Sequence, residues 1–269
     1  MRIARIAQPD GSISYGSPTE TSRTYRELVG SWAAGFAATG RELTAARLLA
    51  PLDPAAILAI GLNYRDHAAE TGAPIPEYPV LFFKNPRSVA APDEPILLPR
   101  RLRSDEVDAE AELAVVLGRD CRNASKENAM EFIAGFSCAN DVSARDWQRR
   151  RSGGQWSRAK SFDTFCPLGP WVVTPDDLPD HANLRICARL NGEVTQQSST
   201  SQMIFDIPSL VAFLSADMTL AAGSVILTGT PHGVGMARKP PVWLQAGDRV
   251  EVEIEGIGTL SNPVEEASA

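Results

Sequence analysis

Two glutamates that lie two residues apart begin an apolar segment of the chain. The segment reads DAEAELAVVLG over residues 108–118, with Glu110 and Glu112 directly before Leu113. In a strand, residues i and i+2 point to the same face, so the two carboxylates would project side by side. Like charges this close repel each other, and burial strengthens the repulsion. The pair therefore needs either a solvated face, as on an edge strand, or a positive group on that face.

A third acid favours a bound cation. Asp141 follows the small, apolar stretch IAGFSCAN (133–140), which indicates that the carboxylate emerges from a buried strand. A hard divalent cation would satisfy three carboxylates together, and oxygen-only ligands favour Mg²⁺ or Mn²⁺, or Ca²⁺, over zinc. Mg²⁺ usually keeps coordination positions for water or substrate oxygens, which suits catalysis. We therefore predict a metal site formed by Glu110, Glu112 and Asp141.

A histidine and a glutamate form a second candidate pair. His67 and Glu70 are three residues apart, so they are neighbours on a helix, and the carboxylate can orient the imidazole and raise its basicity. A solvated helix with ordinary polar residues is the alternative. The segment lies between Gly61 and Gly72, so we expect it to act as a lid that orders on substrate binding. His181, in the stretch LPDHANL, is expected to be exposed.

Composition excludes several classes of protein. The 26 Lys and Arg residues against 33 Asp and Glu residues give a net charge of −7, which argues against nucleic-acid or anionic-membrane partners. The apolar stretches are too short to span a bilayer, and the N-terminus has no signal-peptide pattern, so we expect a cytoplasmic protein. The four cysteines form no C-x-x-C pair and are expected to be buried and reduced. No H-E-x-x-H or G-x-S-x-G motif occurs.

The elements that must position these residues are mostly strands. We expect helices over residues 24–38, 65–72, 124–134 and 206–216. We expect strands within residues 2–8, 13–16, 57–64, 78–86, 184–198, 224–230 and 248–260, with an Asn-Gly hairpin turn at 191–192. The sum is an α+β chain that is mostly β. Prolines at 51 and 54 punctuate the chain and predict a small N-terminal α/β domain over 1–52, followed by a catalytic domain over 53–269.

Six segments together resemble the fumarylacetoacetate hydrolase family, in the branch of fumarylacetoacetate hydrolase domain-containing proteins. They are GLNYRDHAAE, DAEAELAVVLG, NDVSARDWQ, KSFDTFCPLGPW, RLNGEV and ILTGTPHGVG, in this order within residues 57–265. The resemblance implies a distorted β-sandwich or rolled barrel of mixed sheets, with a small N-terminal domain, in a homodimer. It also implies that the three acids are the metal ligands, and that the histidine–glutamate pair is a general base that activates water.

The resemblance implies roles for four further residues. Lys160 would contact the carboxylate or the developing enolate of the substrate, whereas by itself it reads as a surface lysine. Arg145 and Gln148 match positions that contact substrate oxygens, and the alternative for the arginine is a salt bridge with the next aspartate or the acidic cluster. Thr230 matches a substrate-contacting threonine. His232 matches a variable position and receives no role.

The implied reaction is hydrolytic cleavage of a carbon–carbon bond in an acylpyruvate or fumarylpyruvate-like 2-oxo acid, through a metal-bound enolate. The same residues would support an oxaloacetate decarboxylase or tautomerase, or an isomerase of hydroxymuconate-type dienes, because each reaction passes through an enolate. A ureidoglycolate lyase and a non-catalytic member of the fold rank lower. For the hydrolase, decarboxylase, tautomerase and isomerase hypotheses the partner is a small 2-oxo acid.

Overall fold

The computed structural model describes residues 1–268, and most of its regular structure is β. The large sheet contains β1 (Arg2–Ala7), β2 (Ile13–Pro18), β3 (Thr24–Ser31), β4 (Gly35–Thr44), β5 (Arg47–Leu49), β6 (Ile57–Gly61), β7 (Val80–Lys84), β8 (Val89–Ala90), β11 (Ala111–Leu117), β12 (Ile133–Asn140), β14 (Cys166–Val173) and β17 (Val225–Leu227). The second sheet contains β9 (Ile96–Leu98), β15 (Arg185–Leu190), β16 (Glu193–Ser199), β18 (Arg249–Ile254) and β19 (Gly258–Glu266). A third, two-stranded sheet pairs β10 (Val107–Asp108) with β13 (Ser143–Ala144). The predicted mostly-β α+β fold with mixed sheets is confirmed.

Helices are few and short. The α-helices are α1 (Arg65–Thr71), α2 (Trp156–Ala159) and α3 (Ile207–Ser215). The single turns are η1 (Pro86–Ser88), η2 (Ala129–Phe132), η3 (Trp147–Arg151, a π-turn), η4 (Pro175–Asp177), η5 (His181–Asn183), η6 (Thr200–Gln202) and η7 (Gly235–Ala237). Among residues 1–268, no helix is both long and apolar enough to cross a membrane.

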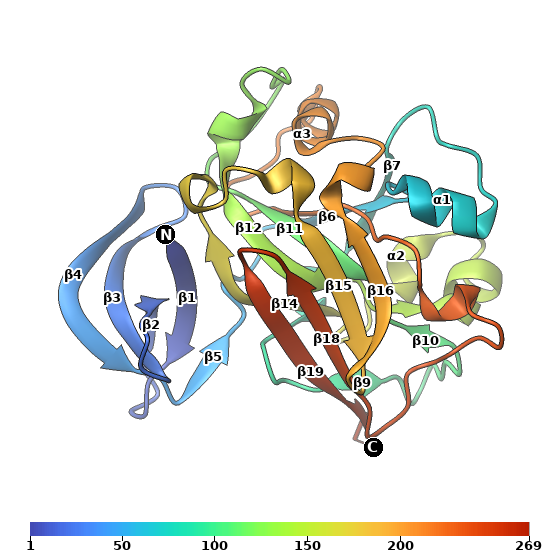
Figure 1. Ribbon diagram of the computed structural model, residues 1–269, viewed down its shortest axis with the longest axis horizontal. Coiled ribbons are helices and arrows are strands. Elements are labelled where there is room, and N and C mark those ends of the chain that lie inside the picture. The colour runs from blue at the N-terminus through green and yellow to red at the C-terminus, as the bar shows by residue number, and fades with distance from the viewer. Residues whose placement is uncertain (269) are drawn as a thin grey trace.

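The large sheet runs in the order β4-β3-β2-β1-β14-β12-β11-β17-β6-β7. Strands β1 to β5 form one end of the molecule, drawn in blue in Figure 1. Strand β1 joins them to the rest of the sheet by pairing Arg2 with Val173 of β14. Within the described residues the sheet is open at β4 and β7, so the strands do not close into a barrel. The proposed domain division at residue 52 stays a prediction.

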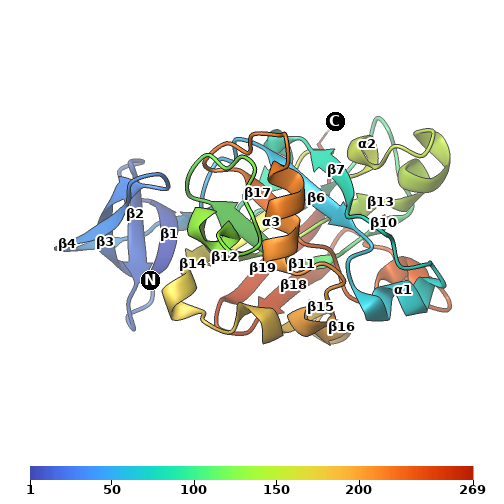
Figure 2. The same ribbon diagram turned by 90° about the horizontal axis from the view of Figure 1, so that it is seen from above.

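The two larger sheets pack face to face, with α3 covering the main core (Figure 2). Strand β11 shows the alternation that this packing requires. Leu113 and Val115 point into the core between the sheets, whereas Ala114 and Val116 point into a second core on the opposite face of the large sheet. Glu112 shares the second face by the period of two. One strand therefore buries apolar side chains on both faces and carries an acid at its start.

The predicted helix over 24–38 is wrong, because this segment folds as β3, a turn and β4. Gly30 and Gly35 adopt φ of +139° and +81°, which L-residues rarely adopt and which an α-helix cannot contain. The apparent helical spacing of Trp32 and Phe36 has another cause. Their rings pack on each other with centroids 5.0 Å apart, at the end of the hairpin.

Two smaller predictions also fail. The helix expected over 124–134 is only the single turn η2, which begins after Asn128. His181 is partly buried rather than exposed, because its ring stacks on Phe136 with centroids 5.2 Å apart.

Other predicted features agree with the structure. The hairpin of β15 and β16 turns at Asn191 and Gly192, both with positive φ, as the Asn-Gly pair predicts. Helix α1 ends at Gly72 in the left-handed conformation. The four cysteines are free and buried.

Candidate active site

All nine residues selected from the sequence line one cavity of about 690 Å³. They are His67, Glu70, Glu110, Glu112, Asp141, Arg145, Gln148, Lys160 and Thr230. Residues from five separate segments of the chain, 67–70, 110–112, 141–148, 160 and 230, therefore meet at one place.

Two adjacent strands bring the three acids together. Strand β11 begins directly after Glu110, and its antiparallel neighbour β12 ends directly before Asp141, so the two acids lie at the same edge of the pair. Asn140 strengthens this junction, because its Oδ1 accepts the backbone N–H of Glu110 at 3.0 Å. One carboxylate oxygen from each of Glu110, Glu112 and Asp141 lies within 4.8 Å of the others. All three residues are buried.

Two of these carboxylates are paired with buried cations. Nζ of Lys160 lies 2.7 Å from Oε2 of Glu110 and 2.6 Å from Oδ2 of Asp141. Arg145 lies 2.6 Å from Oε1 of Glu110, and Nζ of Lys84 lies 2.5 Å from Oδ1 of Asp141. The positive charge that the spacing of the two glutamates required is therefore present, and the solvated-edge alternative is excluded by their burial.

Glu112 differs from the other two acids. Oε2 of Glu112 accepts a hydrogen bond from the backbone N–H of Gly229 at 2.8 Å. Among residues 1–268, Glu112 has no cationic partner within ion-pair distance. Burial, and then the charges of Asp141 and Glu110, raise the pKa of Glu112 well above its ordinary value. Burial also opposes ionisation of Glu110, but Lys160 and Arg145 outweigh it and hold the pKa of that carboxyl well below its usual range.

The buried charges show what the cluster can accommodate. Four carboxylates, those of Asp108, Glu110, Glu112 and Asp141, face Lys84, Lys160 and Arg145, and every one of these residues is at most 5% exposed. With all groups ionised, one negative charge is uncompensated, and it falls on Glu112. An oxygen-rich, under-compensated cluster of this kind fits a hard divalent cation. With that cation, the cluster would carry one positive charge and attract an anionic ligand.

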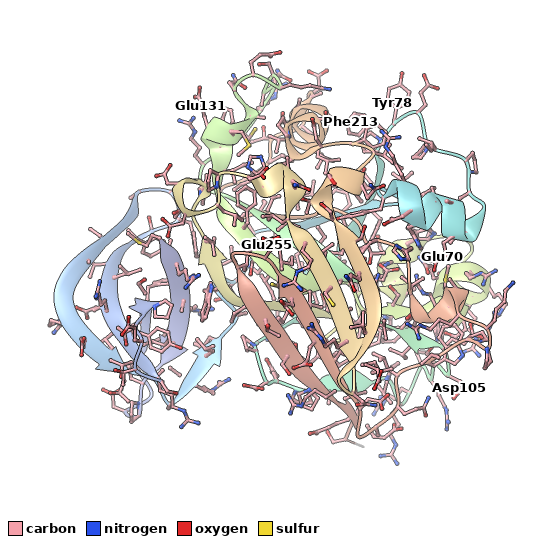
Figure 3. The ribbon with its side chains drawn as sticks, in the orientation of Figure 1. Glu70, Tyr78, Asp105, Glu131, Phe213 and Glu255 are labelled. Atoms are coloured by element: carbon pink, nitrogen blue, oxygen red, sulfur yellow. The ribbon has the colours of Figure 1, made fainter. Side chains whose placement is uncertain are left out.

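The histidine–glutamate pair is formed as its spacing predicts. Nδ1 of His67 lies 3.2 Å from Oε2 of Glu70, and Oε1 of Glu70 accepts the backbone N–H of Gly233 at 2.9 Å. Figure 3 shows Glu70 on the side of α1 that faces the body of the molecule. His67 is buried, and both side chains line the cavity. The imidazole is thus oriented from one side, and its other nitrogen is left for a proton transfer.

The remaining predicted residues differ in how much capacity they keep for a ligand. Arg145 uses four of its five N–H groups, on Asp108, Glu110 and Gln148, so at most one is left. Its salt bridges to Asp108 and Glu110 make it part of the acidic cluster and hold Glu110 in position. Lys160 uses two of three N–H groups. Oγ1 of Thr230 accepts an N–H from the side chain of a buried glutamine at 2.8 Å, which leaves its own hydroxyl proton to donate.

Three residues of the site escaped the sequence analysis. Lys84 stands in the apolar stretch VLFFK, where a lone lysine signals a buried partner; Phe165 O accepts a further bond from its Nζ at 2.9 Å. Asp108, two residues before Glu110, anchors Arg145 at 2.8 Å. Trp156 forms an apolar wall of the cavity with Phe82, their ring centroids 5.5 Å apart. Ion pairs between residues far apart in the sequence, such as Lys84 with Asp141 and Arg145 with Asp108, produce no periodic pattern in the sequence.

Gly61 is required for that wall. A Cβ at this position would lie 2.1 Å from a ring carbon of Trp156, so no larger residue fits without displacing the tryptophan. The glycine thus ends β6 and lets the indole close one side of the cavity.

A mostly-β fold that buries an acidic cluster beside a histidine–glutamate pair at one cavity has the arrangement of an enzyme that acts on small molecules. Residues 56–265 match the family described as fumarylacetoacetate (FAA) hydrolase, C-terminal, and residues 1–51 match the family described as Rv2993c-like, N-terminal. The chain belongs to the fumarylacetoacetate hydrolase family, which confirms the resemblance drawn from its motifs.

Three relatives illustrate the range of names within the family. A Xenopus laevis protein named oxaloacetate tautomerase, mitochondrial, is 50% identical over 218 residues, which cover 81% of this chain and 68% of that protein. The structure of 5-carboxymethyl-2-hydroxymuconate delta-isomerase from Mycobacterium smegmatis is 44% identical, with a TM-score of 0.86, and covers 99% of this chain and 100% of that one. Fumarylacetoacetate hydrolase from Exiguobacterium antarcticum is 38% identical, with a TM-score of 0.88 over the same shares. The cytoplasmic location and the homodimer stay predictions.

We predict that Mg²⁺ or Mn²⁺ stabilises the folded protein through Glu112. A cation at one hundred times its Kd should add about 2.7 kcal/mol to the free energy of unfolding, and Glu112→Gln should remove most of that gain. Thermal unfolding followed by circular dichroism, with and without the metal, measures it. Glu20→Gln, at an exposed site, is the matched control and should keep the full gain. An equal gain in both variants would place the cation elsewhere.

Lys84→Met should be strongly destabilising. The variant keeps the length of the side chain but leaves the buried Asp141 without one of its two cationic partners. Removing one partner of a buried ion pair costs about 3–5 kcal/mol. Urea unfolding gives the free energy. Arg249→Met, which breaks a pair whose side chains are 49% and 81% exposed, should cost at most about 1 kcal/mol. Similar losses in the two variants would contradict the buried role of Lys84.

Proposed function

We propose that the protein is a keto–enol tautomerase of a small 2-oxo dicarboxylic acid of the oxaloacetate type. The 50% identity with a protein named oxaloacetate tautomerase, over 81% of this chain, carries the proposal. It replaces hydrolysis, the reaction first expected, as the main hypothesis. The nine cavity residues support it, because proton transfer between carbon and oxygen needs a base and a stabiliser of the enolate, and both line the cavity.

A divalent cation held by Glu110, Glu112 and Asp141 would supply a Lewis acid that binds the carboxylate and stabilises negative charge on the 2-oxo oxygen. Lys160, with one N–H group left, donates to the same oxygen as its charge develops. Arg145 holds Glu110 in place from the other side. These groups are fixed before the substrate binds, so no reorganisation is needed during the reaction.

His67 moves the proton. From the keto form, its free ring nitrogen takes a proton from C3 of the substrate, and the C–H electron pair shifts into the C2–C3 bond while the carbonyl pair shifts onto oxygen. The imidazolium then returns the proton to that oxygen, which gives the enol. Glu70, 3.2 Å from Nδ1, stabilises the imidazolium between the two transfers. Atoms and charge balance without water or any further reactant.

A second carboxylate on the substrate needs a second cation. Arg149 of η3 lines the cavity, and its neighbours Arg150 and Arg151 pair with Glu106 and Asp146. Arg149 itself makes no ion pair with any residue from 1 to 268. We infer that Arg149 binds the distal carboxylate of the substrate, because the single net positive charge of the metal-loaded cluster compensates only one carboxylate.

Hydrolysis of an acylpyruvate is the second candidate function. The likeness to a structure named fumarylacetoacetate hydrolase, with a TM-score of 0.88, favours it, and the same histidine–glutamate pair would then activate a water. A panel of oxaloacetate, acetylpyruvate, fumarylpyruvate and a hydroxymuconate, followed spectrophotometrically with Mg²⁺ and Mn²⁺, separates the reactions. Faster cleavage of an acylpyruvate than enol–keto conversion of oxaloacetate would overturn the main proposal.

His67→Ala should lower kcat for enol–keto conversion of oxaloacetate by about 10²–10⁴-fold, the usual contribution of a general base. The decay of enol absorbance measures it. Stabilisation by Mg²⁺ should be retained, because the three acids lie outside α1. Glu131→Gln, at the exposed position labelled in Figure 3, is the control and should leave kcat unchanged. Full activity of the alanine variant would remove His67 from the mechanism.

Arg149→Gln should raise KM for oxaloacetate by about 10–100-fold, as expected for losing a hydrogen bond to a charged group. KM for a 2-oxo acid with a single carboxylate, such as acetylpyruvate, should not change. Arg150→Gln provides the matched control on the next residue. An equal rise in KM for both substrates would show a general effect on the pocket instead of recognition of the distal group.

A further inference from the structure

Asp66 of α1 makes three contacts that the chemistry above does not use. Its Oδ1 accepts the backbone N–H of His67 at 2.7 Å. Its Oδ2 lies 3.0 Å from Nδ1 of His232 and also accepts the hydroxyl of Ser198. One side chain therefore ties α1 to β16 and to the turn that follows Thr230. Asp66 lies beside the proposed base in the chain but is absent from the residues that line the cavity.

Helix α1 needs such support because it is short. It has seven residues, well below the 12–15 at which an isolated helix becomes marginal in water. Its N-cap residue, Tyr64, makes no capping hydrogen bond with its side chain. A second tie comes from Glu70, which accepts the N–H of Gly233 at 2.9 Å. Both ties lead to the same turn.

That turn is itself fixed to β16. The amide of Gln196, which is 2% exposed, donates to Oγ1 of Thr230 and to the carbonyl of Pro231, each at 2.8 Å. Its Oε1 accepts the N–H of Ala111, between the two glutamates of the cluster, at 2.8 Å. A Cβ on Gly233 would lie 2.2 Å from a backbone oxygen of β16, so the turn and the strand are in close contact. The turn is therefore a rigid support for α1.

We propose that Asp66 is a positioning residue that clamps α1 to Ser198 and His232 and thereby holds the His67–Glu70 pair at the carboxylate cluster. The clamp gives His232 a role that its sequence position does not indicate. The effect on turnover rests on the proposed function, whereas the effect on the helix does not. We expect the clamp to act on the base, because its contacts do not include the three acids: Glu110 precedes β11, Glu112 lies on it and Asp141 follows β12.

The first test compares Asp66→Ala with Asp66→Asn. The alanine variant should lower kcat for enol–keto conversion by about 10–100-fold, because a shift of about 1 Å in a catalytic group has effects of that size. KM should change less than threefold, and the thermal stabilisation by Mg²⁺ should match the wild type. The asparagine variant keeps an acceptor for the N–H of His67 and a polar group for His232, so it should recover most of kcat.

The second test is a double-mutant cycle with His232→Ala. If the two side chains act through their contact, the loss in the double variant should be close to that of Asp66→Ala alone instead of the product of both losses. Asp10→Ala is the matched control, since Asp10 also accepts from a serine hydroxyl and a backbone N–H, but in a remote N-terminal turn. It should leave kcat unchanged.

Hydrogen exchange of residues 65–72 tests the clamp without any substrate. Exchange in this segment should become at least tenfold faster in Asp66→Ala, while β11 stays protected. Unchanged exchange and unchanged kcat would overturn the proposal, and so would a loss of Mg²⁺ stabilisation as large as the loss of kcat. If the wild type does not act on oxaloacetate, faster exchange in α1 would still support the clamp and only the proposed function would fail.

Discussion

The compensation of buried carboxylates by cations from distant segments is the constraint on which this structure depends. Removing an ionised carboxylate from water costs several kcal/mol unless a well-placed counter-charge offsets it. Here the counter-charges come from β7, from the end of α2 and from the residue after β13, as Lys84, Lys160 and Arg145. None of them is near the acids in sequence, except that Arg145 follows Asp141 by four residues. The cluster is therefore stable only when the sheet and the 145–160 segment are folded together.

The compensation is unequal, and the inequality matters for function. Glu110 has two cations and Asp141 has two, while Glu112 has a backbone N–H. Lys160 and Arg145 hold the pKa of Glu110 well below its usual range, which keeps its oxygens available as ligands. When Glu112 ionises, the cluster carries one net negative charge, so binding of a divalent cation is favoured, and binding of an anion is favoured after it. A cluster in which every carboxylate had a cationic partner would be a structural salt-bridge network, with no affinity for a further cation or anion.

How far the sequence predicts the structure depends on the range of the interaction. The period of two in β11 is local, so it predicted that the two glutamates share one face, whereas the burial of that face depends on segments elsewhere in the chain. The spacing of Trp32 and Phe36 was also local but ambiguous, and the backbone conformation of Gly30 decided for a hairpin. Lys84 escaped notice because its partner is 57 residues away. Five of the nine cavity residues were selected from local spacing and charge. The other four, Arg145, Gln148, Lys160 and Thr230, were found because family motifs carry long-range information that the pattern of a single sequence lacks.

One site that suits several reactions must be specialised by the parts around it. Tautomerisation, decarboxylation and hydrolysis all place negative charge on the same substrate oxygen, so the acids and Lys160 favour none of them over the others. Hydrolysis differs in requiring a water beside the base, in the cavity that α1 and the wall of Phe82 and Trp156 border. That wall exists because Gly61 has no side chain. The choice of reaction therefore depends on the position of α1 and the fit of the indole, while the charge cluster supplies the chemistry that all the reactions share.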